Sequence, residues 1–168
     1  MAVPMLESLL NSLFGLSTGL LVLAATSSAA LAGDPKGVWM TEGKDAALTI
    51  TQCGGQLCGR IVWLASATDR SGALRLDDKN PDPAKRAQRI CGLVAITGLK
   101  PSGPDRWDGS VYNPQDGKTY RSNITVLSDT TLKIRAYIGL PIFGRSETWT
   151  RVHDPAASGI DYNCRRPG

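Results

Sequence analysis

Apolar and polar residues alternate along most of the chain after residue 36, in short segments bounded by glycine, proline, asparagine or aspartate. In the segment 132–138, for example, Leu132, Ile134 and Ala136 share one face while Lys133 lies on the other. A period of two is typical of a β-strand with one buried face. The alternation predicts strands at 37–41, 47–52, 57–64, 92–99, 106–112, 118–127, 132–138 and 145–152.

Most of these segments are joined by short connections that suit hairpins. Asp116-Gly117 supplies the positive φ that a tight turn needs, and a further turn is expected at 101–105. The longest irregular stretch, 65–91, holds one helical turn at 83–88 that starts with proline. A meander of this kind leaves exposed edges unless it closes. We therefore expect an all-β fold, an up-and-down antiparallel barrel of about eight strands that is filled by side chains or holds one small ligand.

The first 32 residues have the pattern of a cleaved export signal. Residues 13–26 carry no charge, and Ala30 and Ala32 stand where a signal peptidase reads small residues. The start carries Glu7 and no basic residue, which departs from the pattern. A membrane anchor is the alternative, but the apolar run is shorter than the roughly 20 residues of a spanning helix. We expect a signal peptide at 1–32, one barrel domain at 33–152 and a polar tail at 153–168, in a periplasmic or secreted protein.

The charge balance is mildly basic. Removal of residues 1–32 takes away Glu7 and no basic residue, which raises the net charge from +4 to +5. The charges are scattered, whereas a nucleic-acid groove needs a dense stripe with interleaved aromatic residues. A solvated surface is the simplest interpretation, and weak attraction to anionic lipid headgroups is the alternative.

All four cysteines, Cys53, Cys58, Cys91 and Cys164, lie after residue 32. An even number of cysteines in an exported protein indicates disulfides. Cys53 and Cys58 flank four residues that suit a hairpin turn, so we expect them to pair. Cys91 with Cys164 follows by elimination and would tie down the tail. Metal binding is the alternative, but one Cys-x4-Cys pair without a second close pair is a poor zinc signature.

The two ends of the barrel region form a recognisable combination. Gly37 and Trp39 open the first strand, and Arg151 lies near the end of the last. This arrangement resembles that of lipocalins, in which the final-strand arginine packs over the first-strand tryptophan. The resemblance implies barrel closure by Gly37, Trp39 and Arg151, with a cation–π contact worth about 0.5–2 kcal/mol.

A longer series of segments is similar to the bacterial family called domain of unknown function 2147, over residues 37–151. The resemblance implies an exported β-barrel of calycin type and no established activity. The segments are LCGRIVWL at 57–64, DKNPDP at 78–83, CGL at 91–93, YNPQDGKTY at 112–120, YIGLPIFGR at 137–145 and TWTR at 148–151.

Several aromatic residues are candidates for a ligand site. Trp63, Trp107 and Trp149 line a cavity or fill the core, and Tyr112 and Tyr120 place polar ends near the barrel rim. The turn at 113–118 between these tyrosines is either functional or a plain hairpin loop.

The connection 139–144 is apolar where a turn is usually polar. Leu140, Ile142 and Phe143, followed by Arg145, indicate either a lid over the barrel mouth or a docking patch. The alternative is that the loop folds back and is buried on the barrel end.

The chain is poor in groups for catalysis. His153 is the only histidine, there is no Gly-x-Ser-x-Gly motif, and no cofactor signature is found, so an enzyme is not expected. Asp78, Asn80 and Asp82 have the opening spacing of a calcium loop, but proline follows where glycine is needed. Capping of nearby backbone N–H groups is the preferred interpretation, and no metal site is expected.

Two functions remain. The first is an exported barrel that binds a small apolar or amphipathic ligand. The alternative is an envelope interaction or structural protein with a filled barrel and no ligand. Neither predicts a nucleic-acid partner. An open apolar interior would favour the first and a plugged barrel the second.

Overall fold

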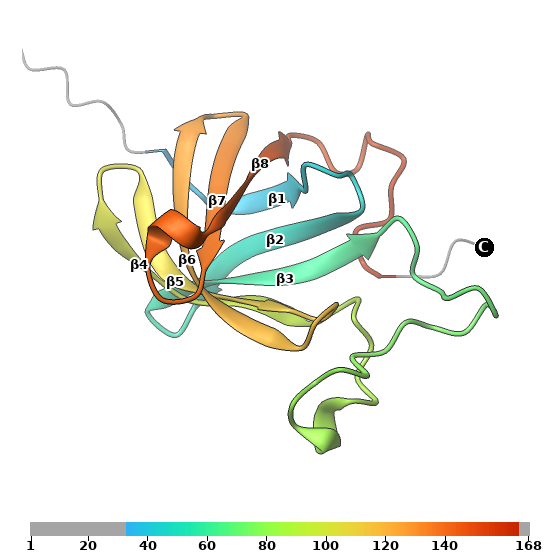
Figure 1. Cartoon of the computed structure of the whole chain (residues 1–168). Coiled ribbons are helices and arrows are strands. Elements are labelled where there is room, and N and C mark those ends of the chain that lie inside the picture. The colour runs from blue at the N-terminus through green and yellow to red at the C-terminus, as the bar shows by residue number, and fades with distance from the viewer. Residues whose placement is uncertain (1–32, 165–168) are drawn as a thin grey trace, which may run out of the picture. The chain divides into compact units, whose positions relative to one another are not determined.

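The computed structural model describes residues 33–164, in which eight antiparallel strands close into a barrel. Each strand pairs with the next, and the last strand pairs with the first (Figure 1). The predicted all-β up-and-down barrel is therefore confirmed. The elements are β1 (Gly37–Met40), β2 (Ala46–Cys53), β3 (Gln56–Leu64), the 3-10 turn η1 (Pro83–Lys85), β4 (Val94–Gly103), β5 (Arg106–Asn113), β6 (Lys118–Ser128), β7 (Thr131–Tyr137), the 3-10 turn η2 (Pro141–Phe143) and β8 (Arg145–Val152).

The expected signal at residues 1–32 lies outside the described residues, as do residues 165–168. No helix within 33–164 is long and apolar enough to cross a membrane.

Two boundaries differ from the prediction. β4 runs on to Gly103, so the turn expected at 101–105 narrows to the residues around Asp105, whose φ is 53°. Pro101 is accommodated because the pairing of β4 with β5 shifts register on both sides of it. The helical turn expected at 83–88 is also shorter, and η1 begins beside Asp82, whose side chain accepts a hydrogen bond from the Ala84 N–H.

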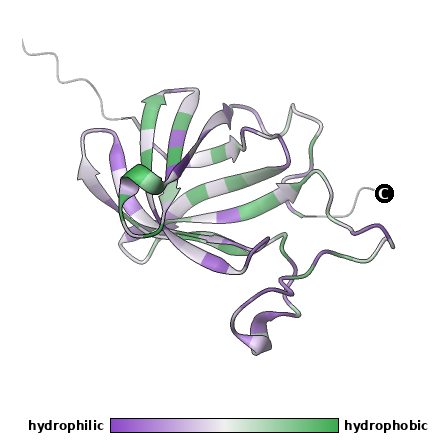
Figure 2. Cartoon of the chain, viewed as in Figure 1, coloured by the Kyte–Doolittle hydropathy of each residue, from purple (hydrophilic) through white to green (hydrophobic). Residues whose placement is uncertain are grey.

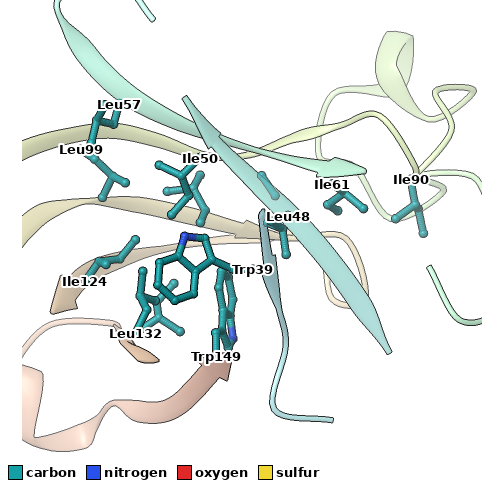
Figure 3. Packing of buried hydrophobic residues seen from close by; sticks show 13 residues of the cluster. Trp39, Leu48, Ile50, Leu57, Ile61, Ile90, Leu99, Ile124, Leu132 and Trp149 are labelled. Atoms are coloured by element: carbon teal, nitrogen blue, oxygen red, sulfur yellow. The ribbon is translucent and has the colours of Figure 1, made fainter. Parts of the chain in front are cut away.

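The inward faces of the strands form one apolar core. Trp39 pairs with Leu48 of β2, and Gly59 of β3 leaves room for Ile96, whose side chain would lie 2.8 Å from a Cβ at that position. Burying each large apolar side chain contributes about 1.5–3 kcal/mol. Figure 3 shows the cluster, whose least exposed apolar members are Trp39, Ile50, Ile96, Leu99, Ile124 and Leu132.

One end of the barrel is closed by Arg151 and Trp39. The Arg151 guanidinium carbon lies 4.1 Å from the centroid of the Trp39 ring. The same guanidinium donates hydrogen bonds to the backbone oxygens of Asp34, Lys36 and Asp129. Gly37 is required beside it, because its φ is 123° and a Cβ there would lie 2.6 Å from Arg151 Nη1.

The structure contains the two expected disulfides. Cys53 and Cys58 link β2 to β3 beside the turn that joins these strands, with their Cα atoms 5.9 Å apart. Cys91 and Cys164 are separated by 73 residues and have Cα atoms 5.6 Å apart. The Cys164 N–H also donates to the Val62 oxygen at 3.0 Å, so the C-terminal segment is fastened to β3.

Candidate functional site

A cavity of about 840 Å³ opens at the other end of the barrel. Its mouth is formed by the β1–β2 connection, the long β3–β4 loop, the β5–β6 turn and the β7–β8 loop. Its deeper walls are apolar, and its rim carries tyrosines and charged residues. The apolar wall residues include Leu48, Ile61, Ala95, Ile134 and Trp149.

β8 contributes a polar stripe to the inside of this cavity. Arg145 pairs with Ala136, Glu147 with Ile134 and Trp149 with Leu132, and these β7 partners belong to the strand's inward face. Trp149 is 4% exposed, and its indole Nε1 donates to Glu147 Oε2 at 3.0 Å. The strand thus places a cation, a carboxylate and an aromatic ring one below another in the cavity.

Asp116 and Tyr120 form a hydrogen-bonded pair at the rim. The Tyr120 hydroxyl donates to Asp116 Oδ2 at 2.5 Å, and the Lys118 N–H donates to Oδ1 at 3.0 Å. Partial desolvation works against the charged carboxylate, but these hydrogen bonds outweigh it and hold the pKa of Asp116 below its ordinary value. The accepted hydrogen bond also raises the pKa of Tyr120. The pair fixes the Tyr120 ring along the cavity wall.

The long β3–β4 loop is anchored to the barrel through a fully buried carboxyl group. Asp77 is 0% exposed and accepts hydrogen bonds from the Tyr112 hydroxyl and from Asn80 Nδ2, both at 2.6 Å. Desolvation and the hydrogen bond to Asp77 raise the pKa of Tyr112 to about 12. Because a buried carboxyl group is costly without hydrogen bonds, this contact fixes the position of the loop at the cavity mouth.

The same loop also contacts the β5–β6 turn. Lys79 Nζ donates to the Gln115 oxygen at 2.6 Å, and a Cβ on Gly117, whose φ is 70°, would lie 2.0 Å from the Lys79 oxygen. Two segments of the family pattern, 78–83 and 112–120, therefore meet at the open end. A second cavity of about 500 Å³ is lined by this loop and by residues of β3, β4, β5 and β6.

Within the loop, Asn80 and Asp82 act as caps. Asn80 Oδ1 accepts from the Asp82 N–H at 2.9 Å, and Asp82 Oδ1 accepts from the Ala84 N–H at 3.0 Å. These are the local contacts that the capping interpretation of this segment expects.

The β7–β8 loop presents apolar side chains to solvent. Leu140, Ile142 and Phe143 are 61%, 75% and 77% exposed, so the alternative that this loop is buried on the barrel end is wrong. Figure 2 shows η2 as a hydrophobic turn. Arg135 holds the loop from below by donating to the Pro141 and Ile142 oxygens. Gly144 is required there, since a Cβ would lie 2.6 Å from the Ala136 oxygen.

The structure brings some of the sequence candidates together and separates others. Tyr112, Tyr120, Trp149, Phe143 and Arg145 line the large cavity, together with Ile138. The Tyr112 hydroxyl, however, is turned toward Asp77 of the loop. Leu140 and Ile142 belong to the same loop but do not line the cavity.

Trp63 and Trp107 are not among the residues that line the cavity. The β2–β3 pairing shifts between Ala47 and Leu48, so Trp63 pairs with Ala47, whose neighbour Leu48 points inward. Trp63 is thereby placed on the outer face. Trp107 pairs with the buried Ile124 and packs against the core.

Sequence reasoning missed Arg75, Asp45 and Glu147. Arg75 and Asp45 come from loops, where no periodicity assigns a direction. Glu147 could have been found, because it lies two residues before Trp149 on a strand with a period of two.

The comparisons with known proteins agree with this architecture. A family model described as an uncharacterized protein conserved in bacteria, DUF2147, matches residues 37–151. The chain belongs to the DUF2147 family. Among curated proteins, none matches. A solved structure, HP1028 from Helicobacter pylori, is described as belonging to the lipocalin family; it shares 22% identity over 73% of this chain and 85% of its own, with a TM-score of 0.64. At that identity the likeness shows that this DUF2147 protein has a lipocalin-like fold.

Proposed function

We propose that this DUF2147 barrel binds a small apolar or amphipathic molecule in the cavity at its open end. The observation that carries the proposal is the cavity of about 840 Å³, with an apolar floor and a polar rim. Ligand sites are typically concave, mostly apolar and equipped with a few polar groups that orient the ligand. A cavity of this size weighs against the alternative of a barrel plugged by its own side chains.

We further propose that the protein acts in the periplasm or is secreted. The uncharged run before Ala32 supports export, and the Cys53–Cys58 and Cys91–Cys164 bridges support an oxidising compartment. Export would place the barrel where it could carry or sense molecules of the cell envelope.

Native mass spectrometry of protein purified from the periplasm, with no ligand added, tests both proposals. We expect a chain that starts at Gly33 and whose mass is four hydrogens below that of the reduced chain, because two disulfides have formed. We also expect an adduct that organic solvent releases. An intact chain starting at Met1, found only in the cytoplasm, would contradict export.

Two tryptophan substitutions on β7 test whether the adduct binds in the cavity, one on the inner face and one, as the control, on the outer face. Ala136 lines the cavity on the inner face of β7, so Ala136→Trp should fill the mouth and abolish the adduct. Lys133→Trp adds the same ring on the exposed outer face of β7 and should retain it. An adduct that survives Ala136→Trp would show that binding occurs elsewhere.

The exposed β7–β8 loop favours a second candidate function, docking to a lipid surface. Leu140, Ile142 and Phe143 form one apolar turn beside the cavity mouth, and Arg135 and Arg145 lie next to it on a chain of net positive charge. Docking there would present the mouth to the membrane from which a ligand could enter.

A further inference from the structure

The cavity lining contains two arginines whose guanidinium groups have no partner within residues 33–164. Arg75 comes from the β3–β4 loop, and Arg145 is the first residue of β8. No hydrogen bond or ion pair is made by either guanidinium in this part of the chain. An arginine at a cavity mouth with all its donors available is suited to bind an anionic group.

The carboxylates of the lining differ from the arginines in this respect. Asp45, Asp116 and Glu147 are solvent-exposed, as is Arg145, so water screens all of these charges, but each carboxylate already accepts a hydrogen bond from a neighbouring side chain. The three carboxylates outnumber the two arginines, but each of the three is already bound by a side-chain donor of the protein, whereas neither guanidinium group is bound within residues 33–164. The donors are the Thr41 hydroxyl for Asp45, the Tyr120 hydroxyl for Asp116 and the Trp149 indole for Glu147.

Arg145 also lies in a row of the sheet whose other two members have small side chains. It pairs with Ala136, which in turn pairs with Ser122 of β6. Ser122 is 1% exposed, and its hydroxyl has no hydrogen-bond partner among the described residues. Buried hydroxyl groups are normally paired. Ser122 is not among the residues that line the cavity, however, so from this row only Arg145 and Ala136 face a ligand there.

We propose that the ligand is an amphipath with an anionic group, a carboxylate or phosphate, that binds Arg145 at the mouth while its apolar part lies on Trp149. Arg75 contributes a second positive charge to the same opening. This inference rests on the ligand-binding function proposed above and adds the chemistry of the headgroup. A charge-assisted hydrogen bond in this position makes binding selective for the sign of the headgroup.

The test compares ligands that share one tail and differ in the headgroup. Isothermal titration calorimetry of the purified protein measures the dissociation constants of dodecanoate, dodecyl phosphate, dodecanol and dodecyltrimethylammonium, all below micelle-forming concentrations. We expect the two anions to bind at least about tenfold more tightly than the other two. Equal affinity for dodecanol or the ammonium compound would overturn the headgroup inference and leave the ligand-binding function standing.

Two matched variants locate the effect. Arg145→Gln should weaken dodecanoate about tenfold and leave dodecanol nearly unchanged. Arg121→Gln removes the same charge from the exposed outer face of β6 and should change neither. Equal effects of the two variants on dodecanoate would assign the selectivity to net charge and overturn the role of Arg145. If no compound of the series binds, the ligand-binding function and this inference both fail.

Discussion

β8 carries one arginine toward each end of the barrel, and the two are used differently. At the closed end, Arg151 stacks on Trp39 and donates to three backbone oxygens. At the open end, Arg145 lines the cavity, and its guanidinium group makes no hydrogen bond or ion pair with the described residues. Both arginines belong to the same face of the same strand, since six residues separate them and the period is two.

The two arginines show that one strand, β8, can carry a residue that stabilises the fold and another that is available to bind a ligand. Hydrogen bonds that are already satisfied inside the protein contribute to folding and are not available to a ligand. Unsatisfied donors at a cavity mouth contribute little to folding and can bind a ligand. The closed end is thus held by contacts within the chain, and the open end carries groups that remain available to a ligand.

The largest effect on stability should come from the closed end. Trp39→Ala removes a fully buried indole from beneath Arg151, and we expect it to lower the free energy of unfolding by about 3–5 kcal/mol. Denaturation with urea, followed by circular dichroism, measures the loss. Trp63→Ala, on the partly exposed outer face of β3, serves as the comparison and should cost less. A loss below about 1 kcal/mol for Trp39→Ala would show that this end does not hold the barrel closed.

A smaller loss of unfolding free energy is expected from a substitution at the contact between the barrel and the long β3–β4 loop. Tyr112→Phe leaves the buried Asp77 carboxyl with one donor fewer, which should cost about 1–3 kcal/mol. Tyr120→Phe removes a hydroxyl–carboxylate contact of the same kind from the exposed pair with Asp116 and should cost less. Equal losses for the two variants would mean that burial of Asp77 does not strengthen the loop contact.

The raised pKa of Tyr112 gives this contact a pH signature. Because its pKa rises from 10.0 in the unfolded chain to about 12 in the folded barrel, the neutral phenol is favoured in the folded state. The stabilisation is fully present below pH 10 and is lost as the pH rises toward 12. The difference in unfolding free energy between the wild type and Tyr112→Phe should therefore shrink over that window. A difference that stays constant would assign the effect of the substitution to packing.

The closed end could be predicted from sequence and the open end only in part. The alternation of apolar residues predicts the strands, and the resemblance to lipocalins implies that Arg151 packs over Trp39 beside Gly37, as the structure shows. The β2–β3 hairpin likewise brings Cys53 and Cys58 together locally. The strands and the hairpin depend on local periodicity and on the order of neighbouring strands, whereas the closed-end contact needed the family resemblance.

The remaining features depend on contacts that no local pattern records. The hydrogen bond between Asp77 and Tyr112 joins residues 35 apart in the chain, through a loop with no period. One register shift in the β2–β3 pairing turns Trp63 to the outside, although its position in the alternation predicts the inside. Sequence reasoning therefore found the scaffold and several wall residues, and missed Arg75 and Asp45 of the loops and Glu147 of β8.

The smallest change in stability should come from the tip of the β7–β8 loop. The double substitution Leu140→Ser and Ile142→Ser alters exposed side chains that do not line the cavity, so the unfolding free energy should change by less than about 0.5 kcal/mol. If the loop docks on lipid, the variant should sediment less with vesicles of phosphatidylglycerol and phosphatidylethanolamine, while its affinity for dodecanoate in solution stays unchanged. Phe143→Ser alters a side chain that does line the cavity and should weaken both.

The opposite pattern would favour a lid over a docking patch. If the double variant loses affinity for dodecanoate in solution and sediments with vesicles as the wild type does, Leu140 and Ile142 must close over the cavity when the ligand binds. Arg135 would then fasten the base of a lid, since it holds the Pro141 and Ile142 oxygens in either case. In that outcome the open end would acquire an ordered cap only with ligand present, whereas the closed end has its cap, Arg151 on Trp39, built into the chain.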